Sequence, residues 1–240
     1  MLLLKINLIR LTKFILKSFP YIYFPIFKIL NRDSNMIVSL KTNIVIEGYP
    51  RSGNTFLESL IKVAFKNKVN IAHHTHSLAQ IKKSISYNLP TLVLIRNPFD
   101  TAISNFYFFK KKYSIENFLF EYYLYYKTIL KYHSKILIIN FEEIKQINKL
   151  ISKIENKFKF NIDKNIIISE AIVLDHLNLQ SKYRHGVNYR ESYLKSNDLK
   201  IEKSDLRYEI DKFESIKKTY IYLKCMRVYE NITSQINFET

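Results

Sequence analysis

The chain has 240 residues, enough for one domain with a sizeable core, and its hydrophobic content of 47% excludes an intrinsically disordered protein. A single cysteine, Cys225, excludes an internal disulfide framework and a zinc site built on cysteines. The net charge of +17 favours an anionic cofactor, an acidic acceptor, a membrane surface or nucleic acid as partner, but the Lys-rich composition typical of an A+T-rich gene explains it equally well.

Residues 1–31 are apolar and basic, and their apolar side chains recur at helical spacing: Leu4, Leu8, Leu11, Ile15 and Leu16. Lysines and arginines lie between them, as in a helix that rests on an anionic membrane surface. A helix packed on the domain explains the pattern equally well. The longest charge-free run is broken by two prolines and is shorter than the ~20 residues that a membrane-spanning helix needs. We therefore expect a cytoplasmic protein, with peripheral contact at the inner face of a membrane as one of the two alternatives.

The segment 43–65 predicts a strand, a tight loop and a helix. The apolar run 44–46 is typical of a buried strand, and a helical pattern after the loop places Phe56, Leu60, Val63 and Ala64 on one face. The loop between them, 48–55, is bounded by two of the chain's three glycines. Glycine makes up roughly 7% of an average protein, so its scarcity here predicts positions that need positive φ or close backbone approach.

The loop resembles the phosphate-binding pattern G-x-x-x-x-G-K-[ST], since Gly48, Gly53 and Thr55 fit it. The lysine position holds Asn54, and the cation lies inside the loop at Arg51. Backbone N–H groups and the helix dipole favour an anion at such a place. The sequence therefore predicts an anion other than an ordinary nucleoside triphosphate, against the alternative of a plain strand-to-helix turn.

A second strand, 69–72, leads into His73-His74-Thr75-His76. A metal site, a general base and chance polar residues are three interpretations. We expect no metal, because neighbouring strand residues point to opposite faces and no carboxylate or cysteine is nearby. A general base at the carboxyl end of a strand is favoured, where open α/β sheets bind their ligands.

A third strand, 91–95, is apolar at nearly every position and should be central and covered on both faces. Arg96 follows it, and a helix is predicted to begin directly afterwards, with Asn97 as N-cap and Pro98 in the first turn. Ser104 lies about two turns into this helix, on the same side as the cap. Arg96 and Ser104 can therefore face one ligand.

The remaining segments complete an alternation of strands and helices. We expect helices at 81–88, 142–158, 163–177 and 204–229, a strand at 135–141, an aromatic core segment at 106–132, and no clear periodicity over 181–198. This alternation predicts a single-domain α/β fold with a P-loop-type parallel sheet of four or five strands flanked by helices. The three candidate site segments all follow strands, so they should converge on one edge of the sheet.

Three segments together resemble sulfotransferases that use 3′-phosphoadenylyl sulfate (PAPS). Loop 48–55 looks like the family's 5′-phosphosulfate loop, and 94–104 is similar to its 3′-phosphate motif R-[ND]-P-x-[DE]-x-x-x-S. Arg184-His185-Gly186 looks like its late R-x-G loop. The resemblance covers most of 41–200 and implies a basic N-terminal segment at 1–40 followed by a sulfotransferase domain at 41–240.

The resemblance also implies roles for individual residues. Arg51 would neutralise the leaving phosphate, and the 5′-phosphate would be held by Ser52, Gly53, Asn54 and Thr55. The 3′-phosphate would be bound by Arg96, Ser104, Arg184, His185 and Gly186. His76 matches the histidine of the family's K-T-H and is the first choice as catalytic base, with His74 as the second candidate. The cations Arg51 and Arg96 are expected to lower the pKa of His76.

The implied reaction moves the sulfuryl group of PAPS to an acceptor hydroxyl, for which a saccharide or a glycolipid is the first expectation. A P-loop kinase or NTPase of another kind is the alternative, against which the missing loop lysine argues. A basic nucleic-acid-binding module is a third possibility, but it leaves both phosphate motifs unexplained. Nucleic acid is therefore not expected as a partner.

Overall fold

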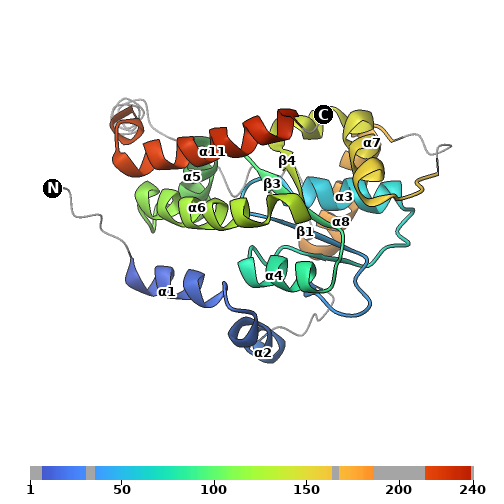
Figure 1. Ribbon diagram of the computed structural model, residues 1–240, viewed down its shortest axis with the longest axis horizontal. Helices are drawn as coiled ribbons and strands as arrows, with labels where there is room; N and C mark the ends of the chain where they lie inside the picture. Colours follow the sequence, from blue (N-terminus) through green and yellow to red (C-terminus); the bar gives the residue numbers. More distant parts are fainter. Residues whose placement is uncertain (1–6, 31–35, 164–167, 186–213, 239–240) are drawn as a thin grey trace.

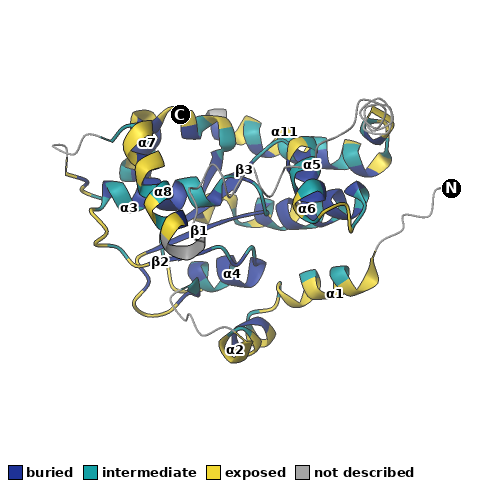
Figure 2. Cartoon of the chain, turned by 180° about the vertical axis from the view of Figure 1, so that it is seen from behind, coloured by how far each residue is buried: buried dark blue, intermediate teal, exposed yellow. Residues whose placement is uncertain are grey.

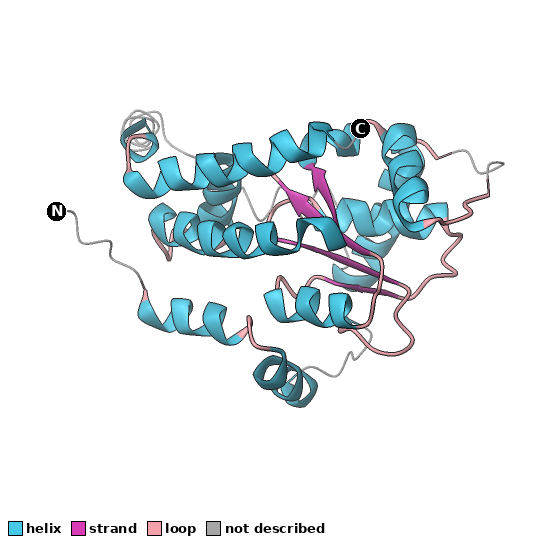
Figure 3. Cartoon of the chain, in the orientation of Figure 1, coloured by secondary structure: helices cyan, strands magenta, loops and turns pink. Residues whose placement is uncertain are grey.

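The computed structural model describes residues 7–30, 36–163, 168–185 and 214–238. Its centre is a sheet of four parallel strands in the order β2-β1-β3-β4, drawn in magenta in Figure 3. The strands are β1 (Ile44–Gly48), β2 (Ile71–His73), β3 (Thr91–Ile95) and β4 (Leu137–Asn140). The predicted α/β class with a parallel sheet is confirmed, and four strands lie within the described part of the chain.

Helices cover both faces of the sheet, and alternate residues of β3 show how. Leu92 and Leu94 pack with α3, α7 and α8, whereas Val93 and Ile95 pack with α4, α5, α6 and α11 (Figure 1). Each β3 residue is buried, so this strand is central and covered on both faces, as expected. The helix bounds are α3 (Asn54–Ala64), α4 (Leu78–Ser86), α5 (Pro98–Phe108), α6 (Ile115–Ile129), α7 (Ile147–Phe158), α8 (Glu170–His185) and α11 (Tyr220–Phe238).

The start of α5 follows the predicted chemistry. The side chain of Asn97 accepts hydrogen bonds from the backbone N–H groups of Phe99 and Asp100, at 2.9 and 3.4 Å, and Pro98 occupies the first turn. The aromatic segment predicted as core, 106–132, does lie in the core. Its helix α6 buries Phe118, Tyr122, Tyr125 and Tyr126 completely.

Several predicted helix bounds are wrong. The predicted helix 142–158 is a 3-10 turn, Phe141–Lys145, followed by α7, because Gln146 leaves the helical conformation at φ −104° and ψ 62°. The helix predicted at 163–177 is α8, which begins at Glu170 and continues to His185, so the first residues of the segment 181–198 are helical.

The predicted C-terminal helix, 204–229, begins and ends later than expected. Residues 204–213 lie outside the described residues, a short helix covers 214–217, and α11 follows at Tyr220. Helix α11 continues past Tyr229 because its buried side chains recur along one face that packs on α6: Ile221, Cys225, Val228, Ile232 and Ile236.

Two helices, α1 (Leu8–Leu16) and α2 (Pro20–Leu30), precede the sheet. In Figure 2 both are mostly exposed, and α1 has no buried residue. Helix α2 packs on α4 through Tyr23 and Phe24. In the part of the chain that the structure describes, no helix has both the length and the apolar character needed to cross a membrane. The domain boundary near residue 40 stays a prediction.

Candidate functional site

The loop between β1 and α3 requires both of its glycines. A Cβ atom on Gly48 would lie 2.7 Å from the Asn54 side chain and 2.8 Å from the carbonyl oxygen of Leu94, so any larger residue would collide there. Gly53 has a φ of 97° and precedes α3 without a side-chain cap. The predicted reasons for keeping glycine, close approach and positive φ, are therefore both confirmed.

Buried hydrogen bonds fix the shape of this loop. The hydroxyl of Tyr126 donates to the carbonyl oxygen of Leu94 at 2.6 Å and accepts from the backbone N–H of Tyr49 at 3.2 Å. Ser52 is fully buried, and its hydroxyl lies 3.3 Å from that of Tyr126. The Asn54 side chain donates to loop carbonyl oxygens at 3.4 and 3.5 Å. The Ser52 and Asn54 side chains therefore hold the loop, and their predicted phosphate contacts stay predictions.

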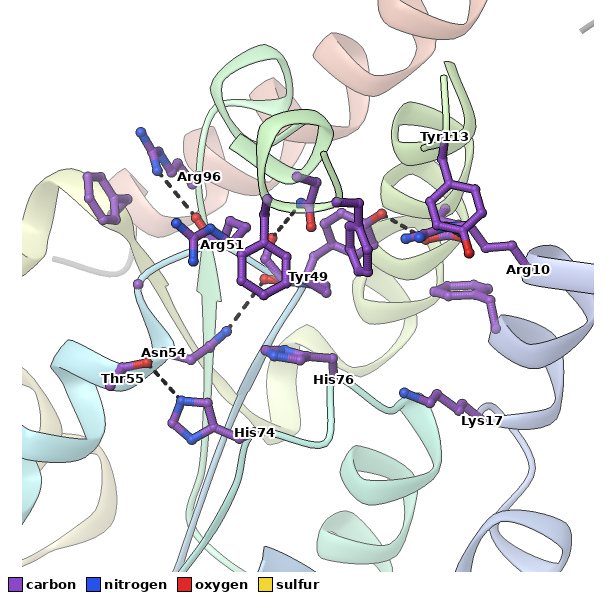
Figure 4. Close-up of a pocket in the computed structure, with 18 of the residues that line it drawn as sticks. Arg10, Lys17, Tyr49, Arg51, Asn54, Thr55, His74, His76, Arg96 and Tyr113 are labelled. Atoms are coloured by element: carbon purple, nitrogen blue, oxygen red, sulfur yellow. Dashed lines mark hydrogen bonds and ion pairs between the residues drawn. The ribbon is translucent and has the colours of Figure 1, made fainter. Parts of the chain in front are cut away.

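The two predicted phosphate motifs meet at Arg51. Its Nε donates to the Ser104 hydroxyl at 3.0 Å, and its carbonyl oxygen accepts from Arg96 Nη1 at 3.3 Å (Figure 4). The Arg96 guanidinium stacks on Phe141, 4.5 Å from the ring centre. The expected meeting of Arg96 and Ser104 is thus made through Arg51, whose guanidinium contacts Ser104 and whose backbone carbonyl oxygen contacts Arg96.

His76 is held in one tautomer beside this loop. Its Nδ1 lies 2.8 Å from the carbonyl oxygen of Gly48, so Nδ1 donates its proton there and the lone pair is on Nε2. Burial, followed by smaller contributions from His74, Lys17 and Arg51, lowers the pKa of His76 from 6.5 to about 3. The expected direction holds, but burial is the largest cause, and Lys17 takes the place that the sequence assigned to Arg96.

The second histidine candidate, His74, has a different environment. Its Nε2 lies 2.8 Å from the hydroxyl of Thr55, and its Nδ1 lies 3.3 Å from Oε2 of Glu58 on α3. His73 Nδ1 is also 3.3 Å from this oxygen, and the two Nδ1 atoms contact each other. Burial alone would raise the pKa of Glu58, but His73, His74 and Lys62 more than offset it, and the net shift is downward.

Both premises against a metal at these histidines are therefore wrong. Strand β2 ends at His73, and His74 has a φ of 59°, so the alternation of a strand no longer separates the two rings. The carboxylate comes from Glu58, which is distant in the sequence but buried beside both rings.

A cavity of about 990 Å³ joins these residues, and its lining includes Arg51, Thr55, His74, His76 and Arg96. Helix α1 forms one wall of this cavity, and nothing in the sequence predicted that it would. Arg10 and Lys17 line the cavity, and Figure 4 shows both across from the loop residues.

An ion pair between a partly buried arginine and a buried glutamate holds α1 in place. The Arg10 guanidinium donates to both carboxylate oxygens of Glu121 on α6, at 2.6 and 2.9 Å, and the Tyr49 hydroxyl donates to the same carboxylate at 2.9 Å. The rings of Phe109, Tyr113 and Phe118 surround the guanidinium at 4.4 to 4.8 Å. Nothing in the sequence signals this pair, because Arg10 is one of 38 basic residues and its partner lies far along the chain.

Glu47, at the end of β1, is a second residue that sequence reasoning missed. It is fully buried, and its Oε1 accepts from the backbone N–H and the hydroxyl of Thr75, at 3.1 and 2.6 Å. Burial raises the pKa of Glu47 from 4.5 to about 7. Because Thr75 lies between His74 and His76, this carboxyl group positions the histidine segment.

The late R-x-G segment is described only in part. Arg184 and His185 form the end of α8, but their side chains lie outside the described residues, as does Gly186. Their predicted contacts with a 3′-phosphate stay predictions.

No protein-family profile matches the chain, and no curated protein matches it. Among solved structures, the chain is similar to mouse sulfotransferase SULT7A1 complexed with PAP, with a TM-score of 0.46 and 15% sequence identity. The match covers 82% of this chain and 91% of the mouse chain. The matched protein is a sulfotransferase, the family that the sequence motifs resemble.

Proposed function

We propose that the protein transfers the sulfuryl group of PAPS to an acceptor hydroxyl. The observation that carries the proposal is the contact of Arg51 with both Ser104 and Arg96, which joins the 5′-phosphosulfate loop to the 3′-phosphate motif. A nucleotide with phosphate groups at both ends of its ribose needs cations and hydroxyl donors grouped in this way.

The site suits an anion in two further respects. Arg96 Nε is buried and has no hydrogen-bond partner in the described part of the chain, so a phosphate oxygen would satisfy it. Gly53 is the N-cap of helix α3 and offers no capping side chain, so the first N–H groups of the helix can bind a second anionic group. Arg51, Gly53 and Thr55 would hold the 5′ end, and Arg96 with Ser104 the 3′-phosphate.

The positions of His76 beside the loop and of Arg51 within it support the following reaction. His76 Nε2 accepts the proton of the acceptor hydroxyl as its oxygen forms a bond to sulfur. The bond between sulfur and the bridging phosphate oxygen breaks, and Arg51 stabilises the charge that develops on that oxygen. The products are the sulfated acceptor, adenosine 3′,5′-bisphosphate (PAP) and a protonated His76. Bound anions would raise the low pKa of His76 and so assist this transfer.

A saccharide or glycolipid is the proposed acceptor. The cavity, at about 990 Å³, lies at the upper end of the usual range for ligand sites and can hold a nucleotide together with part of a second molecule. Its wall from α1 carries the exposed Ile9 next to Arg10, so a lipid-linked sugar could approach along this helix.

Calorimetric titration tests the cofactor assignment. PAP should bind, and 5′-AMP, which lacks the 3′-phosphate, should bind more weakly. Arg96→Ala should weaken PAP binding by about 1.5–3 kcal/mol, the range for a hydrogen bond to a charged group, and should leave 5′-AMP binding nearly unchanged. Arg227→Ala, at an exposed position on α11, controls for the loss of one positive charge.

Equal affinities of the wild-type protein for PAP and 5′-AMP would contradict the 3′-phosphate assignment. Stabilisation by ATP–Mg²⁺ but not by PAP would instead favour a kinase or NTPase. The transfer itself is then measured with radiolabelled PAPS against a panel of saccharide and glycolipid acceptors.

A further inference from the structure

Three potential metal ligands meet below the phosphate loop. Glu58 Oε2 lies 3.3 Å from Nδ1 of His73 and 3.3 Å from Nδ1 of His74, and the ligand atoms of the three side chains all lie within 4.8 Å of one another. Zinc bonds of about 2.0–2.1 Å in a tetrahedral arrangement separate neighbouring ligand atoms by about 3.3–3.4 Å. The two carboxylate-to-imidazole distances therefore match two edges of a zinc tetrahedron. The third edge does not match, because the two Nδ1 atoms contact each other, so one ring would have to turn away for both to bind one ion.

The partners around these ligands orient them toward a common point. His74 Nε2 lies 2.8 Å from the Thr55 hydroxyl (Figure 4), so Nε2 can carry the proton and Nδ1 the lone pair. Metal-binding histidines in proteins are oriented in this way by a partner at their second nitrogen. Lys62 Nζ contacts the other carboxylate oxygen, Oε1, at 2.5 Å, which leaves Oε2 directed at the two rings.

An ion pair between Glu58 and protonated histidines is the competing explanation. Lys62 already neutralises this carboxylate, so two further protonated rings would give the cluster an excess of positive charge. Glu58 is fully buried, and the side chains of His73 and His74 are only 10% and 20% exposed, so this excess would be poorly solvated. A cation bound by Oε2 and the two Nδ1 atoms would take the place of the ring protons and would counter the carboxylate with fewer buried charges.

We propose that Glu58, His73 and His74 bind one Zn²⁺ ion. The donor set of two imidazoles and one carboxylate suits zinc, and it leaves a fourth position for water. His74 and Thr55 line the cavity, so the ion would link the end of β2 and helix α3 to the phosphate loop. Its role is to position Thr55 and His74, and the sulfuryl-transfer chemistry needs no step at the metal. The inference stands independently of the proposed function.

Titration of the chelator-treated full-length protein with ZnCl₂ tests the inference. Wild-type protein should bind one Zn²⁺ per chain and gain thermal stability, and Co²⁺ should give the intense visible absorption of a four-coordinate site. His73→Gln and Glu58→Gln should each weaken Zn²⁺ binding at least tenfold. Thr55→Val, which removes only the partner of His74, should weaken it about 10- to 100-fold.

The matched control is His133→Gln, which removes an exposed histidine outside the cluster and should bind Zn²⁺ as wild type does. Circular dichroism shows whether each variant folds. If His73→Gln binds Zn²⁺ as tightly as wild type, the ion is bound elsewhere and the inference is wrong. Where a ligand variant fails to fold, the wild-type protein decides. If it shows neither the Co²⁺ absorption nor stabilisation by Zn²⁺, the inference is wrong.

Discussion

Substituting Glu47→Gln removes an ionisable group that the fold buries in the central sheet. The side chain is fully buried, and its Oε2 has no hydrogen-bond partner in the described part of the chain. Burial raises the pKa of Glu47 from 4.5 to about 7, whereas in the unfolded chain this carboxyl group should titrate at its ordinary value. Between these pH values the folded protein keeps a proton that the unfolded chain has lost.

This difference makes folding less favourable as the pH rises. Between the two pKa values the free energy of unfolding falls by about 1.4 kcal/mol per pH unit. The total loss is about 3 kcal/mol above pH ~8. His76 acts in the opposite direction, because its pKa is lowered from 6.5 to about 3, so its contribution to stability is lost as the pH falls through that range. The two contributions largely cancel in the wild-type protein between about pH 4.5 and 6.5.

Urea denaturation of wild type and Glu47→Gln across about pH 4.5 to 8 separates the two contributions. Glutamine can still accept from Thr75, but its amide group adds a constant cost wherever its N–H groups lack partners. The test is therefore how the difference in free energy of unfolding between the variant and the wild type changes with pH. The stability of the variant relative to wild type should rise by about 3 kcal/mol across the range. Glu142→Gln, at an exposed position, controls for the loss of one negative charge. A difference that stays constant or falls with pH would refute the reasoning.

Three further predictions concern the site and helix α1. His76→Ala should lower single-turnover sulfuryl transfer by roughly 10²–10⁴ with nearly intact PAP binding, and near-normal transfer in this variant would remove His76 from the mechanism. Arg10→Ala should lower the free energy of unfolding in urea by about 3–5 kcal/mol, because it leaves Glu121 buried without its cation, and an effect no larger than that of Lys13→Ala would contradict this. The full-length protein should float with anionic liposomes at low salt, since the apolar side chains of α1 are exposed; failure to float would leave α1 as a packed part of the domain.

The sequence alone determined the parts of the site that depend on local chemistry. An apolar run, two glycines in a glycine-poor chain and a helical pattern predicted the strand, loop and helix around 48–55. Asn97 and Pro98 predicted the start of α5, because capping and a fixed φ act within one turn. The parallel sheet then followed from the alternation of strands and helices, and with it the meeting of Arg51, Arg96 and Ser104.

Only the tertiary structure decided which distant side chains meet. Arg10 pairs with Glu121 across 111 positions, and Glu58 reaches two histidines on another element. Such pairings leave no local pattern, because a basic or acidic residue on a helix looks the same whether its partner is water or a buried charge. The burial of Glu47 and His76, which sets their pKa values, likewise depends on what packs around them. Helix lengths were missed for the same reason: α11 continues as far as its apolar face finds α6 to cover it, and packing across the chain decides that limit.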